Sequence, residues 1–220
     1  MQRPTLAVLF FALRGILAFR VIVTGGTHGN EYTGVWVVRR LDQRAAELKS
    51  TYPSLSIETL LANPRAHEQN VRLIDADLNR MFSEADLSSS VAPVGYEARR
   101  AREIHAAVGS ASVAPADLLI DLHTTTTNMG CTLIVGAYSR ASLAAAAYIQ
   151  EQWRRADSDQ TIANAFPLRV LIDENYNQAE CPYLCSIARD GLEIEVGPVA
   201  QGLLRADAVA ATQHALELAL

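Results

Sequence analysis

The 220-residue chain carries 19 Lys and Arg against 24 Asp and Glu, a net charge of −5, and half of its residues are hydrophobic. This composition suits a globular domain with a sizeable core, and the sequence has no long basic run of the kind that indicates nucleic-acid binding. The three cysteines are too few, and odd in number, for a disulfide framework. They therefore favour a reducing compartment, and we expect a cytoplasmic protein.

The first segment, Thr5–Phe19, is apolar and follows Arg3, as the core of a signal peptide does. Arg14 interrupts the run, no small-residue cleavage site follows it, and it is too short for a confident membrane span. We therefore expect a buried first segment or a start codon assigned too early, rather than export or a membrane partner. We expect one domain over residues 1–220. Its core spans residues 19–207, and residues 1–18 form an N-terminal extension.

Apolar, β-rich runs alternate with longer Ala- and Leu-rich stretches along the rest of the chain. The predicted strands are Phe19–Thr24, Ser56–Ala62, Leu118–Leu122, Thr132–Val135, Leu168–Ile172 and Leu192–Val196. The predicted helices are Thr33–Lys49, Tyr96–Val108, Arg140–Arg155 and Ala206–Leu218. Several strands are continuously apolar, which is typical of strands covered on both faces. The alternation predicts an α/β domain with a largely parallel sheet and room for one or two antiparallel strands.

The helix predicted over Tyr96–Val108 is rich in charge. We expect its charged residues, among them Glu97 and Glu103, to form a solvated face. His105 lies in the same helix, and we interpret it as a surface or packing residue rather than a ligand.

Three polar residues lie at or just beyond the ends of predicted strands. His28 follows the first strand, His123 follows "LLIDL", and Glu195 lies at the end of "LEIEV". In open α/β sheets, sites form in the crevice beyond the carboxyl ends of the strands. We therefore expect these three side chains to share one site.

The loop "GGTHGNEYTG", residues 25–34, can be read either as a phosphate loop or as part of a metal site. It contains neither phosphate-loop signature and no lysine. His28 and Glu31 are three residues apart, so both can reach one ion from a single turn. An H-x-x-E pair alone is a weak signal, because such pairs arise by chance in many proteins.

The segment "LLIDLHTTTTNMG" supplies a second candidate ligand, His123. Asp121 lies two residues earlier on the same side of the strand, where it can accept the other ring N–H of a ligating histidine. Alone, His123 reads better as a strand-end histidine bonded to a loop. Together with His28 and Glu31 it completes a two-histidine, one-carboxylate set, a composition familiar from catalytic zinc sites with one ion per chain.

The motifs "GGTHGNE", "NPRA", "DLNR", "DLHTTTTNMG" and "IEVGPVAQGLLRAD" occur in the order seen in aspartoacylases. The chain resembles this family, which belongs with succinylglutamate desuccinylases to the zinc carboxypeptidase-like hydrolases, from Val21 to Asp207. The resemblance implies a three-layer α/β domain with a mixed, mostly parallel sheet. It also implies a zinc-dependent amidohydrolase that cleaves an N-acyl amino acid, N-acetylaspartate or a related one. A desuccinylase-like hydrolase and a non-catalytic binding remnant stay open as alternatives.

The resemblance implies the metal centre position by position. His28, Glu31 and His123 match the zinc ligands of the family. Glu195 matches the glutamate that activates the zinc-bound water and then protonates the leaving amine. Without the resemblance, Glu195 could equally be a buried carboxylate paired with an arginine.

The resemblance also implies how substrate is held. Arg65, in "NPRA", matches an arginine that polarises the scissile carbonyl, and Asn79 and Arg80, in "DLNR", match residues that bind a substrate carboxylate. For both arginines the simpler alternative is a surface salt bridge. We interpret Asp75 and Asp77 as turn residues that shape the segment carrying Asn79.

The chain departs from the family pattern at several points. Cys185 precedes the "SIA" triplet, where the mammalian enzymes have an arginine that grips the substrate. A thiol cannot form a bidentate pair with a carboxylate, so a substrate with an apolar or aromatic side chain becomes more credible. Thr124 stands where family members often have Asn. Family members also carry a further C-terminal β-rich domain, so we expect either that this sequence is a fragment or that the protein has no such domain. Family members often form homodimers.

Overall fold

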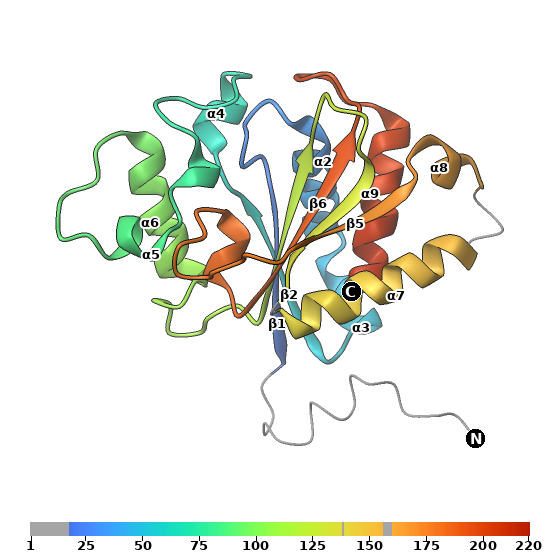
Figure 1. Cartoon of the computed structure of the whole chain (residues 1–220), viewed down its shortest axis with the longest axis horizontal. Coiled ribbons are helices and arrows are strands. Elements are labelled where there is room, and N and C mark those ends of the chain that lie inside the picture. The colour runs from blue at the N-terminus through green and yellow to red at the C-terminus, as the bar shows by residue number, and fades with distance from the viewer. Residues whose placement is uncertain (1–17, 138, 156–159) are drawn as a thin grey trace.

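The computed structural model describes residues 18–137, 139–155 and 160–220. Its six strands form a single sheet in the order β2-β1-β3-β6-β4-β5 (Figure 1). The strands are β1 (Phe19–Gly25), β2 (Leu55–Leu61), β3 (Leu118–Thr124), β4 (Gly130–Gly136), β5 (Leu168–Asp173) and β6 (Asp190–Gly197). All six predicted strands are confirmed, whereas the expectation for the apolar N-terminal run falls almost wholly outside the described residues.

The strand directions make the sheet mixed and mostly parallel, as predicted. Strands β2, β1, β3 and β6 run parallel to one another. Strand β4 pairs antiparallel with β6 and parallel with β5, so the last two strands run in the opposite direction. The carboxyl ends of β1, β3 and β6 therefore meet at one edge of the sheet.

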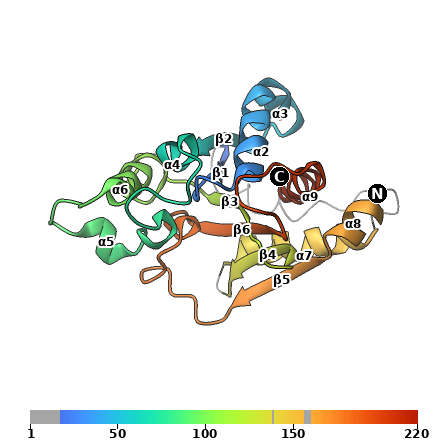
Figure 2. The same cartoon turned by 90° about the horizontal axis from the view of Figure 1, so that it is seen from above.

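Helices cover both faces of the sheet, which gives three layers (Figure 2). One face carries α2 (Tyr32–Gln43), α3 (Ala45–Thr51), α7 (Arg140–Arg155), α8 (Gln160–Ala165) and α9 (Ala206–Ala219). The opposite face carries α4 (Pro64–Glu68), α5 (Glu84–Ser88), α6 (Tyr96–Val108) and the 3-10 turns η1 (Leu78–Arg80) and η2 (Leu184–Ile187). The short helices were not predicted, because five or six residues carry too little periodic signal.

The prediction of a single helix over Thr33–Lys49 is wrong, because the helix is interrupted at Arg44, between α2 and α3. The backbone of Arg44 leaves the helical region, with φ −101° and ψ 13°. Its guanidinium pairs with Glu47 at 2.7 Å and with Glu217 of α9 at 3.3 Å. Leu48, after this interruption, packs in the same core as Leu41 before it. The spacing of apolar residues in the sequence therefore does not reveal that the helix is interrupted.

Alternation along the central strands divides the core in two. In β3, Leu118, Ile120 and Leu122 pack in the larger cluster with α2, α7 and α9. Leu119 packs on the opposite face, in a smaller cluster with residues of α6, η1 and η2. Asp121 and His123 share that second face by strand alternation, which turns both polar side chains away from the larger core.

Gly34, near the start of α2, lets this helix approach β3 closely. A Cβ at this position would lie 2.5 Å from the carbonyl oxygen of Leu122. Because only glycine fits there, the residue that precedes α2, Glu31, is brought beside the end of β3.

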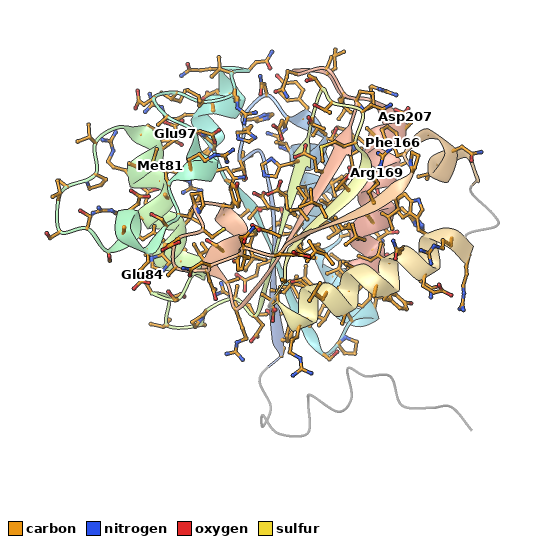
Figure 3. The ribbon with its side chains drawn as sticks, in the orientation of Figure 1. Met81, Glu84, Glu97, Phe166, Arg169 and Asp207 are labelled. Atoms are coloured by element: carbon orange, nitrogen blue, oxygen red, sulfur yellow. The ribbon has the colours of Figure 1, made fainter. Side chains whose placement is uncertain are left out.

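Glu97, from α6, organises the loop that approaches the end of the sheet (Figure 3). Its carboxylate is fully buried and accepts backbone N–H groups of Ile74, Asp75 and Ala76 at 2.7, 2.9 and 3.2 Å. It also accepts the Asn63 amide at 3.1 Å. The prediction that Glu97 belongs to a solvated face is therefore wrong, because the loop's unpaired N–H groups require an acceptor inside the fold.

Among the helices of the described ranges, none has the length and apolar character to cross a bilayer.

Replacing Glu97 with Ala should lower the free energy of unfolding by about 3 kcal/mol, because several N–H groups lose a charged acceptor. Urea unfolding followed by circular dichroism measures this change. Glu103→Ala is the matched control on the same helix, since its side chain is 64% exposed and pairs only with Arg100 among the described residues. That control should change stability by less than about 0.5 kcal/mol. Equal effects of the two substitutions would contradict the role given to Glu97.

Candidate metal centre and active site

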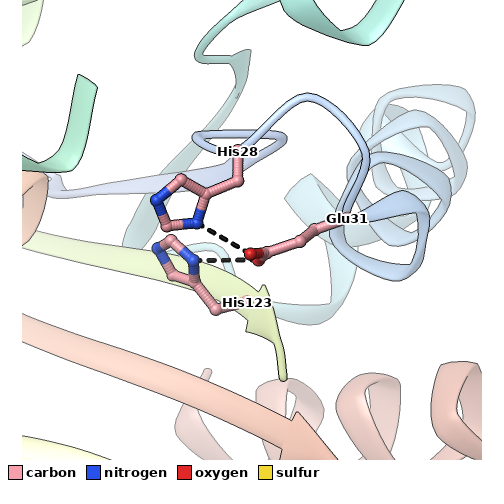
Figure 4. A group of neighbouring side chains, drawn as sticks. All are labelled: His28, Glu31 and His123. Carbon is pink, nitrogen blue, oxygen red and sulfur yellow. Dashed lines mark hydrogen bonds and ion pairs between the residues drawn. The ribbon is translucent and has the colours of Figure 1, made fainter. Parts of the chain in front are cut away.

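His28, Glu31 and His123 converge at the carboxyl edge of the sheet (Figure 4). His28 lies in the loop after β1, Glu31 is the N-cap residue of α2, and His123 lies near the end of β3. All three are buried, and one potential ligand atom from each lies within 4.8 Å of the others. The Nδ1 atoms of His28 and His123 lie 2.7 and 3.0 Å from the two carboxylate oxygens of Glu31.

A carboxylate holds the outer nitrogen of each imidazole. Nε2 of His123 lies 2.8 Å from Asp121, which also accepts the hydroxyls of Thr24 at 2.7 Å and Thr27 at 2.9 Å. Nε2 of His28 lies 3.0 Å from Asp77. Metal-binding histidines ordinarily donate their second N–H to such a group, so this pattern leaves both Nδ1 atoms facing the centre.

The expected pairing of Asp121 with His123 is confirmed, whereas the contact of Asp77 with His28 was missed. Asp77 does act as a turn residue, because its carboxylate accepts the N–H of Asn79 at 2.9 Å. The sequence offers no further signal for its second role, since 49 residues separate Asp77 from His28. Only the folded loop brings the two together.

The donor atoms of the cluster suit a divalent cation. Burial would raise the pKa of Glu31, but the neighbouring imidazoles of His123 and His28 lower it to about 2. The N–H of Thr124 also donates to this carboxylate at 2.9 Å, through its backbone, which any residue at that position supplies. An anionic carboxylate and two imidazoles with fixed outer partners form a donor set that zinc favours.

Glu195 faces the same region from β6. In the parallel register of β3 and β6, Glu195 pairs with His123 and Glu193 pairs with Asp121. Burial raises the pKa of Glu195 to about 7, with His123 opposing the shift and Glu193 adding to it. A carboxyl group that titrates near neutral pH can both accept and return a proton.

A cavity of about 580 Å³ opens beside these residues. Its walls contain five of the residues matched by resemblance, namely His28, His123, Glu195, Asn79 and Arg80, and also Cys185. Asn79 is buried, and its side-chain oxygen accepts the N–H of Leu184 at 2.7 Å. The guanidinium of Arg80 lies 5.0 Å from the centroid of the Tyr183 ring, which also lines the cavity.

The structure does not bring Arg65 to this cavity. Arg65 is exposed on α4, with its guanidinium 4.6 Å from the centroid of the Tyr96 ring. Arg72 lines the cavity instead, 2.8 Å from Nε2 of His28, 3.4 Å from Glu31 and 3.2 Å from Asp77. The sequence signal for Arg72 is its place in "VRLIDADLNR", directly before the motif that carries Asn79.

Replacing Asp121 with Asn should weaken zinc binding by roughly 10- to 100-fold, because His123 loses the carboxylate that fixes its ring. Competition with a chromophoric chelator measures the affinity. His105→Ala is the control, since His105 contacts Ser110 and does not line the cavity beside the cluster. An affinity for zinc that is the same in the Asp121 variant, the His105 variant and the parent chain would contradict this assignment.

Comparison with known proteins places these features in a family. The model of the succinylglutamate desuccinylase/aspartoacylase catalytic domain matches residues 18–220. A probable aspartoacylase from Trichodesmium erythraeum is 36% identical over 201 residues, which cover 91% of this chain and 63% of that protein. An N-acyl-aromatic-L-amino acid amidohydrolase (carboxylate-forming) from Danio rerio is 37% identical over 204 residues, covering 91% of this chain and 61% of that relative.

The fold agrees with that family. The crystal structure of murine aminoacylase 3 superposes with a TM-score of 0.77 at 33% identity, covering 94% of this chain and 64% of the murine chain. The chain thus spans somewhat less than two thirds of the length of these relatives. With its α/β sheet and its buried His28–Glu31–His123 cluster, the chain belongs to the succinylglutamate desuccinylase/aspartoacylase family.

Proposed function

We propose that this chain forms the catalytic part of a zinc-dependent amidohydrolase that cleaves an N-acyl amino acid to a carboxylate and the free amino acid. The observation that carries the proposal is the buried His28–Glu31–His123 cluster with Glu195 lining the same cavity. The names of two relatives, a probable aspartoacylase and an N-acyl-aromatic-L-amino acid amidohydrolase, support the same class of substrate.

The residues present fit one zinc ion, held by His28, Glu31 and His123. Zinc bound there would acidify a water molecule toward a pKa of roughly 7 and polarise the scissile carbonyl. Asp121 and Asp77 keep the imidazole rings oriented toward the centre. These outer contacts hold the ligand set in place before substrate arrives.

Glu195 moves the protons of the reaction. An amide is a poor electrophile with a poor leaving group, so its hydrolysis needs a base for the attacking water and an acid for the departing amine. The carboxylate of Glu195 accepts the proton of the water and then delivers it to the amine nitrogen. Burial raises the pKa of this carboxyl toward neutral pH, which suits both tasks.

Arg72 is the residue that we assign to the developing oxyanion, in place of Arg65. Its guanidinium is fixed by Glu31 and Asp77 and lies beside His28. A cation held in this way is preorganised to stabilise negative charge on the carbonyl oxygen without rearrangement. Arg65, stacked on Tyr96, has no comparable position.

Asn79 and Arg80 are the residues that we assign to a carboxylate of the substrate. Both line the cavity from η1, and Arg80 presents a planar fork whose NH1 also donates to the Asn79 carbonyl at 2.7 Å. Two parallel N–H donors match a carboxylate well, so these residues would orient the substrate relative to Glu195.

The zinc-loaded chain should hydrolyse at least one member of a panel of N-acetyl amino acids, measured as release of free amine. Glu195→Gln should lower kcat by at least about 100-fold, because an amide cannot move the protons. The panel includes N-succinylglutamate, and preferential cleavage of this compound would identify a desuccinylase instead. Zinc and substrate binding without turnover in the parent chain would instead identify a non-catalytic member of the family.

The two arginine assignments can be separated directly. Arg72→Ala should lower kcat by roughly 100-fold or more, because one preorganised oxyanion donor is lost. Arg65→Ala should stay within about threefold, since the Arg65 guanidinium lies over the ring of Tyr96 and does not line the cavity. Steady-state kinetics on the best substrate of the panel give both values. The reverse order of effects would restore Arg65 to the role implied by the resemblance.

A further inference from the structure

We propose that Glu193 makes the cavity selective for N-acyl amino acids whose side chain carries a positive charge. This inference rests on the proposed function, because it names the substrate class of the same site. It assigns a role to an acidic side chain that the hydrolytic steps leave unused.

Glu193 lies within the same cavity as the catalytic groups. It precedes Glu195 by two residues on β6, so both carboxylates project from one face of the strand, roughly 7 Å apart along it. Its register partners are Asp121 on β3 and Ile134 on β4. Glu193 and Ile134 both line the cavity.

The carboxylate of Glu193 has no hydrogen bond or ion pair with any other described residue. Its neighbour Asp121, in contrast, accepts two hydroxyls and the His123 ring. Glu193 is half-buried, so its carboxylate loses part of its hydration without gaining a partner among the described residues, and this is costly to the fold. A ligand that places a cation against it supplies the missing interaction, so the unpaired acid points to an occupant of opposite charge.

The cavity offers no spare cation for an acidic side chain. The described walls carry four acidic residues, Asp173, Glu174, Glu193 and Glu195, against two arginines, Arg72 and Arg80. The proposed reaction uses both arginines, one for the oxyanion and one for the substrate carboxylate. A second carboxylate on the substrate would meet the remaining acids with nothing to balance it.

Cys185 adds no positive charge to this acidic cavity. A Cβ on Gly191 would lie 3.0 Å from Cβ of Cys185, so the thiol packs against β6 near Glu193. The Cys185 side chain offers no positive charge to a substrate, and an acid lies close by on β6. Ile134, Leu171 and Tyr176 line the same cavity and offer apolar surface for the aliphatic stem of a lysine or arginine side chain.

The test compares matched substrates. N-acetyl-L-lysine and N-acetyl-L-norleucine differ chiefly in the terminal ammonium, and N-acetyl-L-glutamate carries the opposite charge. For the zinc-loaded chain, kcat/KM should be at least tenfold higher for the lysine derivative than for the norleucine derivative, and lowest for the glutamate derivative. Glu193→Gln, which keeps shape and removes charge, should reduce the lysine-to-norleucine ratio by at least tenfold.

Glu174→Gln is the matched control, because it removes the same charge from an exposed residue at the rim of the cavity. It should change the ratio by less than about twofold, since solvent screens its charge. Equal cleavage of the lysine and norleucine derivatives, or equal effects of the two substitutions, would overturn the inference and leave the proposed function intact.

A binding experiment keeps the two proposals separable. If no substrate is cleaved, the proposed function fails, and calorimetric titration of the zinc-loaded chain with L-lysine and L-norleucine then tests Glu193 alone. Tighter binding of L-lysine that is lost in Glu193→Gln would support the inference. Equal binding of the two amino acids would overturn it.

Discussion

The whole site depends on the carboxylate of Glu31. Its two oxygens face the Nδ1 atoms of His28 and His123, and this one group joins the loop after β1 to the end of β3. Glu31 reaches that place because α2 approaches β3 at Gly34, where a side chain would strike the carbonyl of Leu122. A packing constraint in the backbone thus fixes the position of an anionic ligand. The buried anion in turn accounts for the attraction of a cation to this edge of the sheet.

The directions of the strands decide which side chains share the cavity. Because β3 and β6 are parallel and adjacent, His123 and Glu195 lie side by side in register. Alternation then places Glu193 on the same face as Glu195, and so inside the cavity. One short stretch of β6 therefore supplies both Glu195, which we assign to proton transfer, and Glu193, which we assign to recognition of substrate charge.

The loop between α4 and η1 supplies the cationic side of the site. Glu97 holds its backbone through Ile74, Asp75 and Ala76, and the same loop presents Arg72 beside His28. A buried carboxylate in the small core is therefore coupled to the position of the arginine that we assign to the oxyanion. The coupling explains why a charged helix residue lies inside the fold, against the pattern expected of a surface helix.

The sequence by itself predicted the strands and the mostly parallel sheet, because apolar runs are local properties. The motifs that it shares with aspartoacylases predicted the family and the convergence of His28, Glu31 and His123. It also predicted the pairing of Asp121 with His123, since strand alternation is local too. Only the tertiary structure decided which arginine reaches the cavity. Contacts such as Arg72 with His28 join residues 44 positions apart in the chain, and a loop's path over the sheet is set by packing and buried hydrogen bonds that no local pattern records.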